Sequence, residues 1–334
     1  MPTSTESLDE LDAAAAAASF SGVVSLQRPG EPLFERAYGL ADRRWRIPNT
    51  PDTIFAAASG AKTFTALLVM SLVLDGTLAL DTTARSLLGA DLPEVADDVT
   101  VEHLLAHRSG IGDYFDEEEL ENTEFMMPLP PRSYVNASDY LTTIDGFPTV
   151  FAAGERFAYN NGGYVLLAIL IERAAGGSYH DLMQDRVIGP AGLVDTTFQR
   201  ADEPLLRTAT GYLEAEGLRN NALHMPLRGV GDGGLFTTTA DVRTFWSALL
   251  AGRILPTETV AEMTRAHSDV PEENARYGLG FWLHPSADPI RMIGSDAGIS
   301  FYSVWRPGTE EILTVISNWT DGGWTIVRHL GGWD

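Results

Sequence analysis

The stretch ASGAKTFTALLVMSLVLDG, residues 58–76, joins a long apolar run to a serine and a lysine near its start. Apolar side chains fill most positions from Phe64 to Leu74, so the pattern predicts a helix that is buried on nearly all sides. Glycine is typical just after the last helical residue, and we expect the helix to end at Gly76. A helix of this kind belongs in the centre of the protein.

Lys62 is the only lysine in the chain, because the other 22 of the 23 basic residues are arginines. An arginine stays charged at any workable pH, whereas a buried lysine can lose its proton and act as a base. Ser59 lies three residues earlier, so the two side chains share one face of a helix. A desolvated lysine can activate a serine as a nucleophile, and the N–H groups at a helix start can stabilise an oxyanion. The Ser-x-x-Lys pattern also occurs by chance, but chance does not explain a single lysine at this position.

Composition limits the classes of function. The 334 residues are 44% hydrophobic and 21% charged, which is enough apolar material for a sizeable core. The formal charge of −23 argues against binding to DNA, RNA or an anionic membrane, because like charges repel. The chain has no cysteine, which excludes disulfides, thiolate metal sites and a cysteine nucleophile.

The amino-terminal segment does not have the pattern of a secretory signal. Residues 1–22, MPTSTESLDELDAAAAAASFSG, are acidic where a signal peptide is basic, so we interpret them as a first helix and expect a cytoplasmic protein. The longest apolar runs, residues 65–74 and 164–171, are much shorter than the roughly 20 residues that a membrane-spanning helix needs. We therefore expect no membrane partner.

Strand patterns lie at both ends of the chain. Residues 21–39 predict a hairpin around a Pro-Gly turn, followed by a loop over residues 41–53. Near the other end, aromatic and β-branched runs predict three strands, within residues 277–284, 300–308 and 310–319, and a final helix follows. Residues 81–270 are mostly helical in pattern, with long loops rich in Gly and Pro. The sequence therefore predicts an α+β fold with one antiparallel sheet built from both chain termini and flanked by helices.

Four blocks of sequence together resemble a known family. They are DTIFAAASGAKTFTALLVMSLVLDGTLALD (residues 52–81), VTVEHLLAHRSGIGDYF (99–115), FAYNNGGYVLLAILIE (157–172) and GDGGLFTTTADVRTF (231–245). In this order and at these separations they resemble the serine β-lactamase and penicillin-recognising family, particularly its class C branch with D-Ala-D-Ala carboxypeptidases and esterases. The resemblance implies one catalytic domain over residues 1–334. Its α/β lobe would be formed by about residues 1–80 and 270–334, and its inserted helical lobe by about residues 81–269.

The resemblance also implies roles for individual residues. Ser59 would be the nucleophile and Lys62 its activating partner. The Tyr-x-Asn element of the family falls on Tyr159 and Asn161. Tyr159 would relay the proton between Ser59 and the leaving group, and Asn161 would hold Lys62 and contact the substrate.

The third element of the family is altered in this chain. Where the family usually carries Lys-Thr-Gly or His-x-Gly on a strand, this chain has Met292, Ile293 and Gly294. The glycine is kept, and the backbone N–H groups of Ser59 and Ser295 could still form an oxyanion hole. The cation that helps to bind a substrate carboxylate is lost, and Arg291 should point to the opposite face of the strand.

Asp296 follows this altered element and has two interpretations. It is either a recognition group for an amine or hydroxyl of the substrate, or a residue that caps the turn in GSDAG. The sequence does not decide between them.

Two further features concern the surroundings of the site. The segment near residues 113–146 mixes acids with aromatic and methionine side chains, and it is either a lid over the site or a solvated acidic loop. His103 and His107 have a spacing that can bind metal, but no third ligand is evident, so we assign His107 a structural role. We expect neither a metal nor another cofactor.

The leading interpretation is a serine hydrolase that forms an acyl-enzyme at Ser59 and cleaves an ester or amide of a small molecule or short peptide, with an esterase favoured. A β-lactamase, D-Ala-D-Ala carboxypeptidase or D-aminopeptidase is the enzymatic alternative. A non-catalytic penicillin-recognising binding module is the alternative of another class. No nucleic acid is expected as a partner in any of them.

Overall fold

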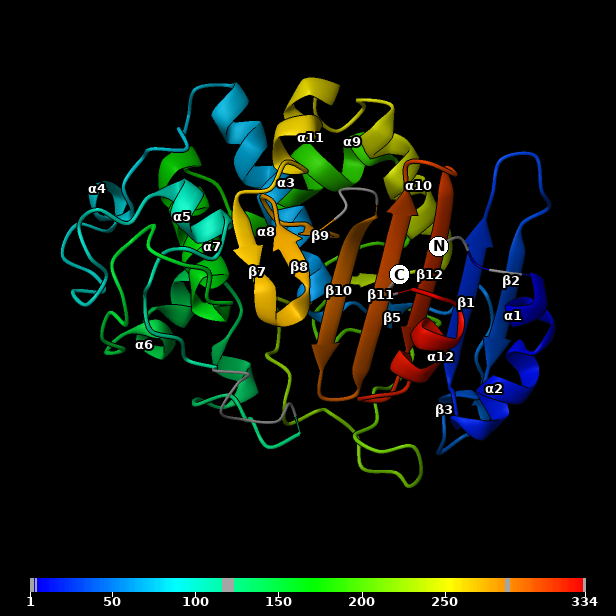
Figure 1. Cartoon of the computed structure of the whole chain (residues 1–334). Coiled ribbons are helices and arrows are strands. Elements are labelled where there is room, and N and C mark those ends of the chain that lie inside the picture. Colours follow the sequence, from blue (N-terminus) through cyan, green and yellow to red (C-terminus); the bar gives the residue numbers. More distant parts are fainter. Residues whose placement is uncertain (1–2, 4, 116–122, 286–288, 333–334) are drawn as a thin grey trace.

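The computed structural model describes residues 3, 5–115, 123–285 and 289–332. Its largest element is an antiparallel sheet of eight strands in the order β2-β1-β12-β11-β10-β9-β8-β7. The strands are β1 (Gly22–Gln27), β2 (Phe34–Tyr38), β7 (Ser268–Val270), β8 (Ala275–Tyr277), β9 (Trp282–Leu283), β10 (Ile290–Asp296), β11 (Ile299–Arg306) and β12 (Glu311–Ser317). The first hairpin of the chain therefore joins the last strand, with Gly22 opposite Ser317 and Gln27 opposite Ile312. This confirms the predicted α+β fold with one sheet made from both ends of the chain (Figure 1).

Helices cover both faces of the sheet (Figure 1). One face is covered by α1 (Thr5–Asp9), α2 (Leu11–Ala17) and α12 (Trp324–His329), whose apolar side chains pack on strand residues such as Val24, Tyr302 and Leu313. The other face packs on the central helix α3 (Ala61–Leu74) and on α10 (Thr239–Leu250). The helices α1 and α2 fall within the segment that the sequence predicts as a first helix.

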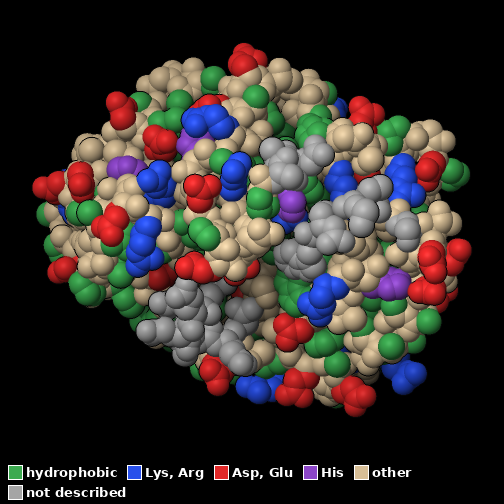
Figure 2. Space-filling model, in the orientation of Figure 1, with side chains coloured by type: hydrophobic (Ala, Val, Ile, Leu, Met, Phe, Trp, Pro, Cys, Tyr) green, Lys and Arg blue, Asp and Glu red, His purple; other side chains and the backbone are tan. Residues whose placement is uncertain are grey.

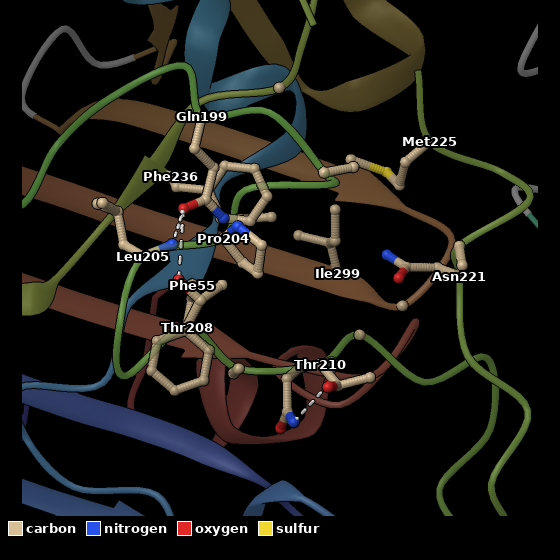
Figure 3. Close-up of a pocket in the computed structure, with 18 of the residues that line it drawn as sticks. Phe55, Gln199, Pro204, Leu205, Thr208, Thr210, Asn221, Met225, Phe236 and Ile299 are labelled. Carbon is tan, nitrogen blue, oxygen red and sulfur yellow. Dashed lines mark hydrogen bonds between the residues drawn. The ribbon is translucent and has the colours of Figure 1, made fainter. Parts of the chain in front are cut away.

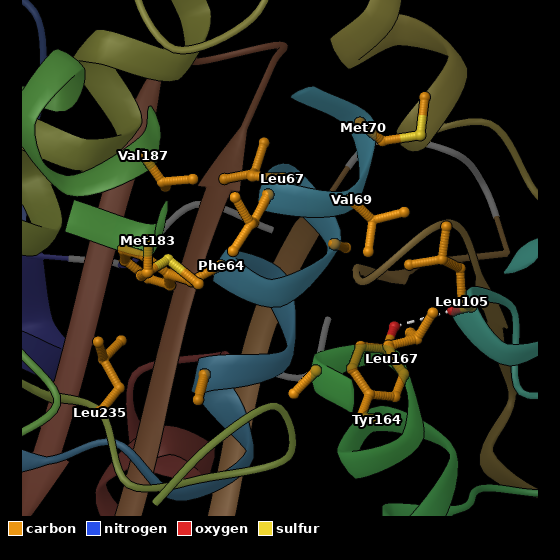
Figure 4. Packing of buried hydrophobic residues seen from close by; sticks show 14 of the residues in the cluster. Phe64, Leu67, Val69, Met70, Leu105, Tyr164, Leu167, Met183, Val187 and Leu235 are labelled. Atoms are coloured by element: carbon orange, nitrogen blue, oxygen red, sulfur yellow. Dashed lines mark hydrogen bonds between the residues drawn. The ribbon is translucent and has the colours of Figure 1, made fainter. Parts of the chain in front are cut away.

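The central helix has the burial that its sequence predicts. Eleven of the fourteen residues of α3 are buried, Lys62 among them. Figure 4 shows Phe64, Leu67, Val69 and Met70 of this helix inside a cluster that reaches from Val187 to Tyr164. The cluster is continuous with the sheet, so α3 is fixed on all sides and can hold its first turn in place.

The remaining helices lie mainly beside α3, away from the sheet. They are α4 (Ala84–Leu88), α5 (Val101–Leu105), α6 (Leu141–Ile144), α7 (Asn161–Ala175), α8 (Tyr179–Met183), α9 (Gly189–Ala191) and α11 (Thr257–Met263). Within the described part of the chain, no helix has the length and apolar character needed to cross a lipid bilayer.

Short strand pairs hold the loops around the site. The pair β5 (Phe55–Ala56) and β6 (Phe236–Thr237) joins the segment before α3 to the segment before α10. The pair β3 (Leu40–Asp42) and β4 (Ile47–Pro48) lies in a segment that the sequence predicts as loop. That prediction missed the pair because prolines and turn-forming residues occupy most of the segment, and only a few residues form the strands.

The surface matches the composition. Acidic side chains are spread over the face shown in Figure 2 and alternate there with arginines, so no basic patch forms on it.

Candidate active site

Ser59 lies in a tight turn between strand β5 and helix α3. The turn is a 3-10 helix over Ala58–Gly60, and Ala58 before the serine has a φ of +44°, a left-handed conformation that side chains other than glycine rarely adopt. The N–H of Ala57 donates to Leu235 O at 2.8 Å, and the N–H of Gly60 donates to Ala57 O at 2.9 Å. Strained backbone of this kind persists only where the surroundings enforce it, and it is common at functional sites.

Lys62 is buried and its ammonium group is surrounded by oxygens. Its Nζ donates to Ser59 Oγ at 2.9 Å, to Asn161 Oδ1 at 2.8 Å and to the backbone oxygen of Asp232 at 3.0 Å. The side chain is only 2% exposed. A lysine ammonium has three donors, so these three contacts use its whole capacity and fix it beside the serine.

Asn161 is the first residue of α7, and its amide is held from both sides. Its Oδ1 accepts from Lys62, and its Nδ2 donates to Phe115 O at 3.1 Å. Its backbone N–H and that of Gly162 donate to the Asp113 carboxylate at 2.6 and 2.8 Å. Burial raises the pKa of Asp113 to about 7, while these N–H groups and the charge of Lys62 act in the opposite direction. Asp113 therefore anchors the start of α7 where Asn161 meets Lys62.

Tyr159 lies next to Lys62, within a group of aromatic rings. The Lys62 Nζ is 4.9 Å from the centroid of the Tyr159 ring. Behind Tyr159, at 4.4 Å between ring centroids, is His107. The Tyr159 ring also stacks on Trp282 at 6.1 Å with an angle of 19°. These rings fix the plane of the tyrosine beside the cation.

His107 is fully enclosed in this aromatic group. Its Nδ1 accepts the N–H of Asn160 at 3.1 Å, and its backbone φ is +53°. Burial, and secondly the charge of Lys62, hold the pKa of His107 well below its usual value. The ring is therefore neutral and supports the Tyr159 to Asn161 segment, which agrees with the structural role expected from the sequence. Within the residues that the structure describes, no three His, Cys, Asp or Glu side chains are grouped so as to hold a metal ion.

Gly294 of β10 lies directly against the turn that carries Ser59. A Cβ at this position would be 2.1 Å from Ala57 O and 3.0 Å from the backbone nitrogen of Ser59. No side chain fits there, which explains the glycine in the altered third element. The close approach places the next residues, Ser295 and Asp296, at the mouth of the site.

The altered element provides no positive charge to the pocket in front of Ser59. Met292 is buried in the core, and neither it nor the buried Arg291 is among the described residues that line this pocket. Asp296 Oδ1 accepts the N–H of Ala297 at 2.7 Å, which is the turn-capping interaction expected as one of its two interpretations. Asp296 also lines the pocket, so the contact does not exclude the other interpretation.

The pocket contains one acid that the sequence analysis missed. Asp232, between the glycines of GDGGLF, accepts the Lys62 ammonium with its backbone oxygen, and its Oδ2 accepts the Tyr114 hydroxyl at 2.6 Å. Burial raises the pKa of Asp232, although Lys62 and the Tyr114 hydrogen bond oppose the shift. Asp232 lies in the fourth block of the family resemblance, but no sequence spacing links it to Lys62 or Tyr114.

The pocket wall comes from several segments. Its described lining residues are Ala58, Ser59, Tyr114, Phe115, Phe125, Met127, Tyr140, Asn161, His224, Met225, Pro226, Gly229, Asp232, Gly233, Gly234, Ser295 and Asp296. Five of them, from Tyr114 to Tyr140, belong to the segment for which the sequence suggests a lid or a solvated loop. Residues 116–122 of that segment lie outside the described residues. The described part forms a wall of the pocket, and its closure over the site stays a prediction.

A second cavity of about 510 Å³ adjoins this pocket. Met225, Pro226, Gly229 and Gly234 line both spaces. Figure 3 shows Met225 and Asn221 at one side of the cavity and Phe55, Phe236 and Pro204 at the other. Ser59 is thus next to a larger and mostly apolar space.

The structure brings the predicted site residues into one place. Ser59, Lys62 and Asn161 are joined by hydrogen bonds, Tyr159 lies beside the same ammonium, and Gly294 contacts the serine turn. Ser295 and Asp296 line the pocket into which Ser59 opens. The arrangement can hold a carbonyl carbon next to a serine hydroxyl that is hydrogen-bonded to a cation.

Comparison with known proteins gives matches over most of the chain. A family model described as Beta-lactamase matches residues 9–327. Penicillin-binding protein 4* of Bacillus subtilis (strain 168) is 29% identical over 303 residues, which are 85% of this chain and 64% of that protein. Esterase EstB of Burkholderia gladioli is 34% identical over 187 residues, which are 54% of this chain and 47% of the esterase. The chain thus spans about half to two thirds of the length of these relatives.

Solved structures have the same fold. The penicillin binding protein from Bacillus halodurans is 29% identical and superposes with a TM-score of 0.89, covering 97% of this chain and 100% of that one. The D-amino acid amidase from Ochrobactrum anthropi SV3 is 26% identical with a TM-score of 0.80, covering 98% of this chain and 97% of the amidase.

Proposed function

The chain belongs to the beta-lactamase family, whose members are serine hydrolases and penicillin-binding proteins, and we propose that it is a hydrolase forming an acyl-enzyme at Ser59. The observation that carries the proposal is the buried ammonium of Lys62, which bonds at once to Ser59 Oγ, Asn161 Oδ1 and the backbone oxygen of Asp232. A serine held in this way is a candidate nucleophile, because a neighbouring cation favours its ionised form.

In the proposed reaction, Ser59 Oγ attacks the carbonyl carbon of an ester or amide and forms a C–O bond. Lys62 uses its three donors in this arrangement and has no lone pair, so we assign the serine proton to Tyr159, whose ionisation the adjacent cation favours. Tyr159 then passes this proton to the leaving group as its bond to the carbonyl carbon breaks. Water attacks the acyl-enzyme, the bond to Ser59 Oγ breaks, and the acid is released while the serine regains its proton.

The developing oxyanion needs two hydrogen-bond donors. We assign this role to the backbone N–H groups of Ser59 and Ser295. The close contact of Gly294 with the Ser59 turn supports this, because it brings β10 next to the backbone nitrogen of Ser59.

We favour an ester or a neutral amide as the bond that is cleaved. Penicillins and D-Ala-D-Ala peptides carry a carboxylate near the scissile bond, and Met292 occupies the position at which the family places a cation for it. No described lining residue of the pocket is a lysine or an arginine. The intact Tyr159 and Asn161 keep a β-lactamase or D-Ala-specific peptidase as the second candidate, since these residues serve that chemistry in the family.

Intact-protein mass spectrometry tests the proposal. The chain, Ser59→Ala and the control Ser247→Ala, which replaces an exposed serine of α10, are each treated with a fluorophosphonate, p-nitrophenyl acetate and benzylpenicillin. We expect an adduct with the chain and the control but none with Ser59→Ala, and turnover of the ester but little of the penicillin.

Other results would lead to other conclusions. Fast hydrolysis of benzylpenicillin would move the β-lactamase interpretation ahead. If no probe labels Ser59, the hydrolase proposal fails and a non-catalytic binding module becomes the better interpretation.

A further inference from the structure

The pocket in front of Ser59 is both acidic and aromatic. Its only charged side chains among the described lining residues, leaving aside His224, are the carboxyl groups of Asp232 and Asp296. We propose that the substrate carries a protonated amine close to the scissile bond, and that the Asp232 carboxylate binds it. This inference rests on the proposed function, because it specifies the substrate of the same site.

Asp232 is held in a fixed position beside Lys62. Its backbone oxygen is 3.0 Å from Lys62 Nζ, so the residue is fixed next to the group that holds the nucleophile. The residue lines the pocket, and its carboxylate is oriented by the Tyr114 hydroxyl at 2.6 Å. The carboxylate also receives backbone hydrogen bonds from Asp232 and Gly233, and since a carboxylate can accept about four, one position is left for a ligand. An ammonium is the ligand that best offsets the cost of burying this charge.

The aromatic rings that line the pocket with Asp232 also favour a bound cation. Tyr114, Phe115, Phe125 and Tyr140 all line the pocket. Phe115 and Phe125 stack with ring centroids 4.1 Å apart, and Tyr114 meets Phe125 edge to face at 5.8 Å. The faces of such rings attract cations, and an aromatic wall beside a carboxylate is suited to an ammonium with an apolar substituent.

The charges of the site also disfavour a substrate that carries a carboxylate near the scissile bond. A carboxylate at this place would face two acids, and the three donors of Lys62 already contact protein oxygens. Repulsion of this kind selects between ligands of the same shape. The adjoining cavity of about 510 Å³, which shares Met225 and Pro226 with the pocket lining, has room for the uncharged remainder of an amino ester or amino amide (Figure 3).

Asp296 provides a matched control for Asp232. Both acids line the pocket, but Asp296 Oδ1 accepts the N–H of Ala297 in the turn after β10. The neighbours of Asp232 are instead the aromatic wall and the Lys62 ammonium. The proposal therefore assigns amine binding to the first acid and turn stabilisation to the second.

Binding to the Ser59→Ala chain tests the proposal without any need for turnover. Titration calorimetry compares phenylalaninol, which carries a protonated amine, with 3-phenylpropan-1-ol, which has the same skeleton without the amine. We expect phenylalaninol to bind at least tenfold more tightly. Asp232→Asn should remove this preference, and Asp296→Asn should keep it. Affinity for the neutral alcohol reports whether the pocket of each variant is still formed, and Asp232→Ala replaces Asp232→Asn if that variant does not fold.

The outcomes separate this inference from the proposed function. Equal affinity for the two alcohols, or a preference that persists without the Asp232 carboxylate, would overturn amine recognition even if Ser59 is labelled by the fluorophosphonate. A preference that depends on Asp232 would support it even if no ester is hydrolysed. In that case only the hydrolase proposal would fail.

Discussion

Lys62 connects three parts of the chain through one amine, namely the serine turn, the start of α7 and the loop before β6. The contacts are 2.8 to 3.0 Å long and the side chain is 2% exposed, so a planar guanidinium cannot take its place without moving at least one partner. We expect Lys62→Arg to lower kcat/KM for p-nitrophenyl acetate by about 10²-fold or more, as is typical when a group that activates a nucleophile is lost.

The test of Lys62 needs a control for the chemistry of the substitution. Arg265→Lys exchanges the same two residue types at an exposed site away from both cavities and should retain the activity of the parent chain. Rates of fluorophosphonate labelling, measured beside ester turnover, show whether the nucleophile itself is affected. Full activity in Lys62→Arg would overturn the role that we give to the lysine.

His107 makes the stability of the protein depend on pH in a definite direction. Its pKa is lowered in the folded state, chiefly by burial, so the unfolded chain takes up a proton first as the pH falls. The contribution of His107 is fully present above its unfolded pKa of about 6.5 and is lost as the pH falls below it. We expect the free energy of unfolding to decrease by up to about 1.4 kcal/mol per pH unit from this group between pH 6 and 5.

The variant His107→Asn isolates this effect. Asparagine tolerates the φ of +53°, and its Oδ1 can accept the N–H of Asn160 as the histidine Nδ1 does, but it does not titrate. Urea unfolding at several pH values should give a shallower decrease for this variant than for the parent chain. Parallel curves would show that His107 is not the source of the pH dependence.

At the scale of the elements, strand β10 and the serine turn are packed so closely that their separation is fixed by one glycine. We expect Gly294→Ala to push the two apart, because its Cβ would be 2.1 Å from Ala57 O. Displacement of a nucleophile by about 1 Å can cost roughly 10²-fold in rate, and we expect a loss of that order in kcat/KM.

A second glycine shows whether the effect is specific. Gly177, in the loop before α8, has ordinary contacts of 3.5 to 3.7 Å around its Cβ position, so Gly177→Ala should retain activity. Ester turnover and thermal unfolding of both variants are measured together. If Gly294→Ala keeps most of its activity, β10 does not position the serine.

How well the sequence predicts an element depends on the length of its apolar run and on the turn residues that bound it. Helix α3 is a long run that is apolar on nearly all sides, and the hairpin of β1 and β2 surrounds a Pro-Gly turn, so both were predicted within a few residues of their bounds. The candidate residues Ser59 and Lys62 could be found because they lie at the start of this apolar run and because the lysine is unique. Asp232 was missed because it lies in a loop, where only the fold brings it to Tyr114 of the segment near residues 113–146 and no sequence spacing indicates the pair.

At the scale of the whole molecule, ion pairs and hydrogen bonds join the two ends of the chain. Glu311 of β12 has a fully buried side chain, and its carboxylate accepts Arg28 Nε at 2.8 Å and Arg306 Nη1 at 2.6 Å. It also accepts the N–H and hydroxyl of Thr3, both at 3.2 Å. One carboxylate thus links the amino-terminal segment, β1 and the last hairpin of the sheet.

Removal of one partner from a buried ion pair leaves the others with uncompensated charge, which usually costs about 3–5 kcal/mol. We expect a decrease of this size in the free energy of unfolding for Glu311→Gln, measured with urea so that the denaturant adds no salt. Asp202→Asn breaks the exposed pair with Arg200 and should cost less than about 1 kcal/mol. Because Glu311 and these partners are not among the described residues that line the pocket, ester turnover by folded Glu311→Gln should stay close to that of the parent chain. If the two variants were equally stable, the ends of the chain would be held by the hydrophobic packing of α2 and α12 on the sheet, and the buried carboxylate would contribute little.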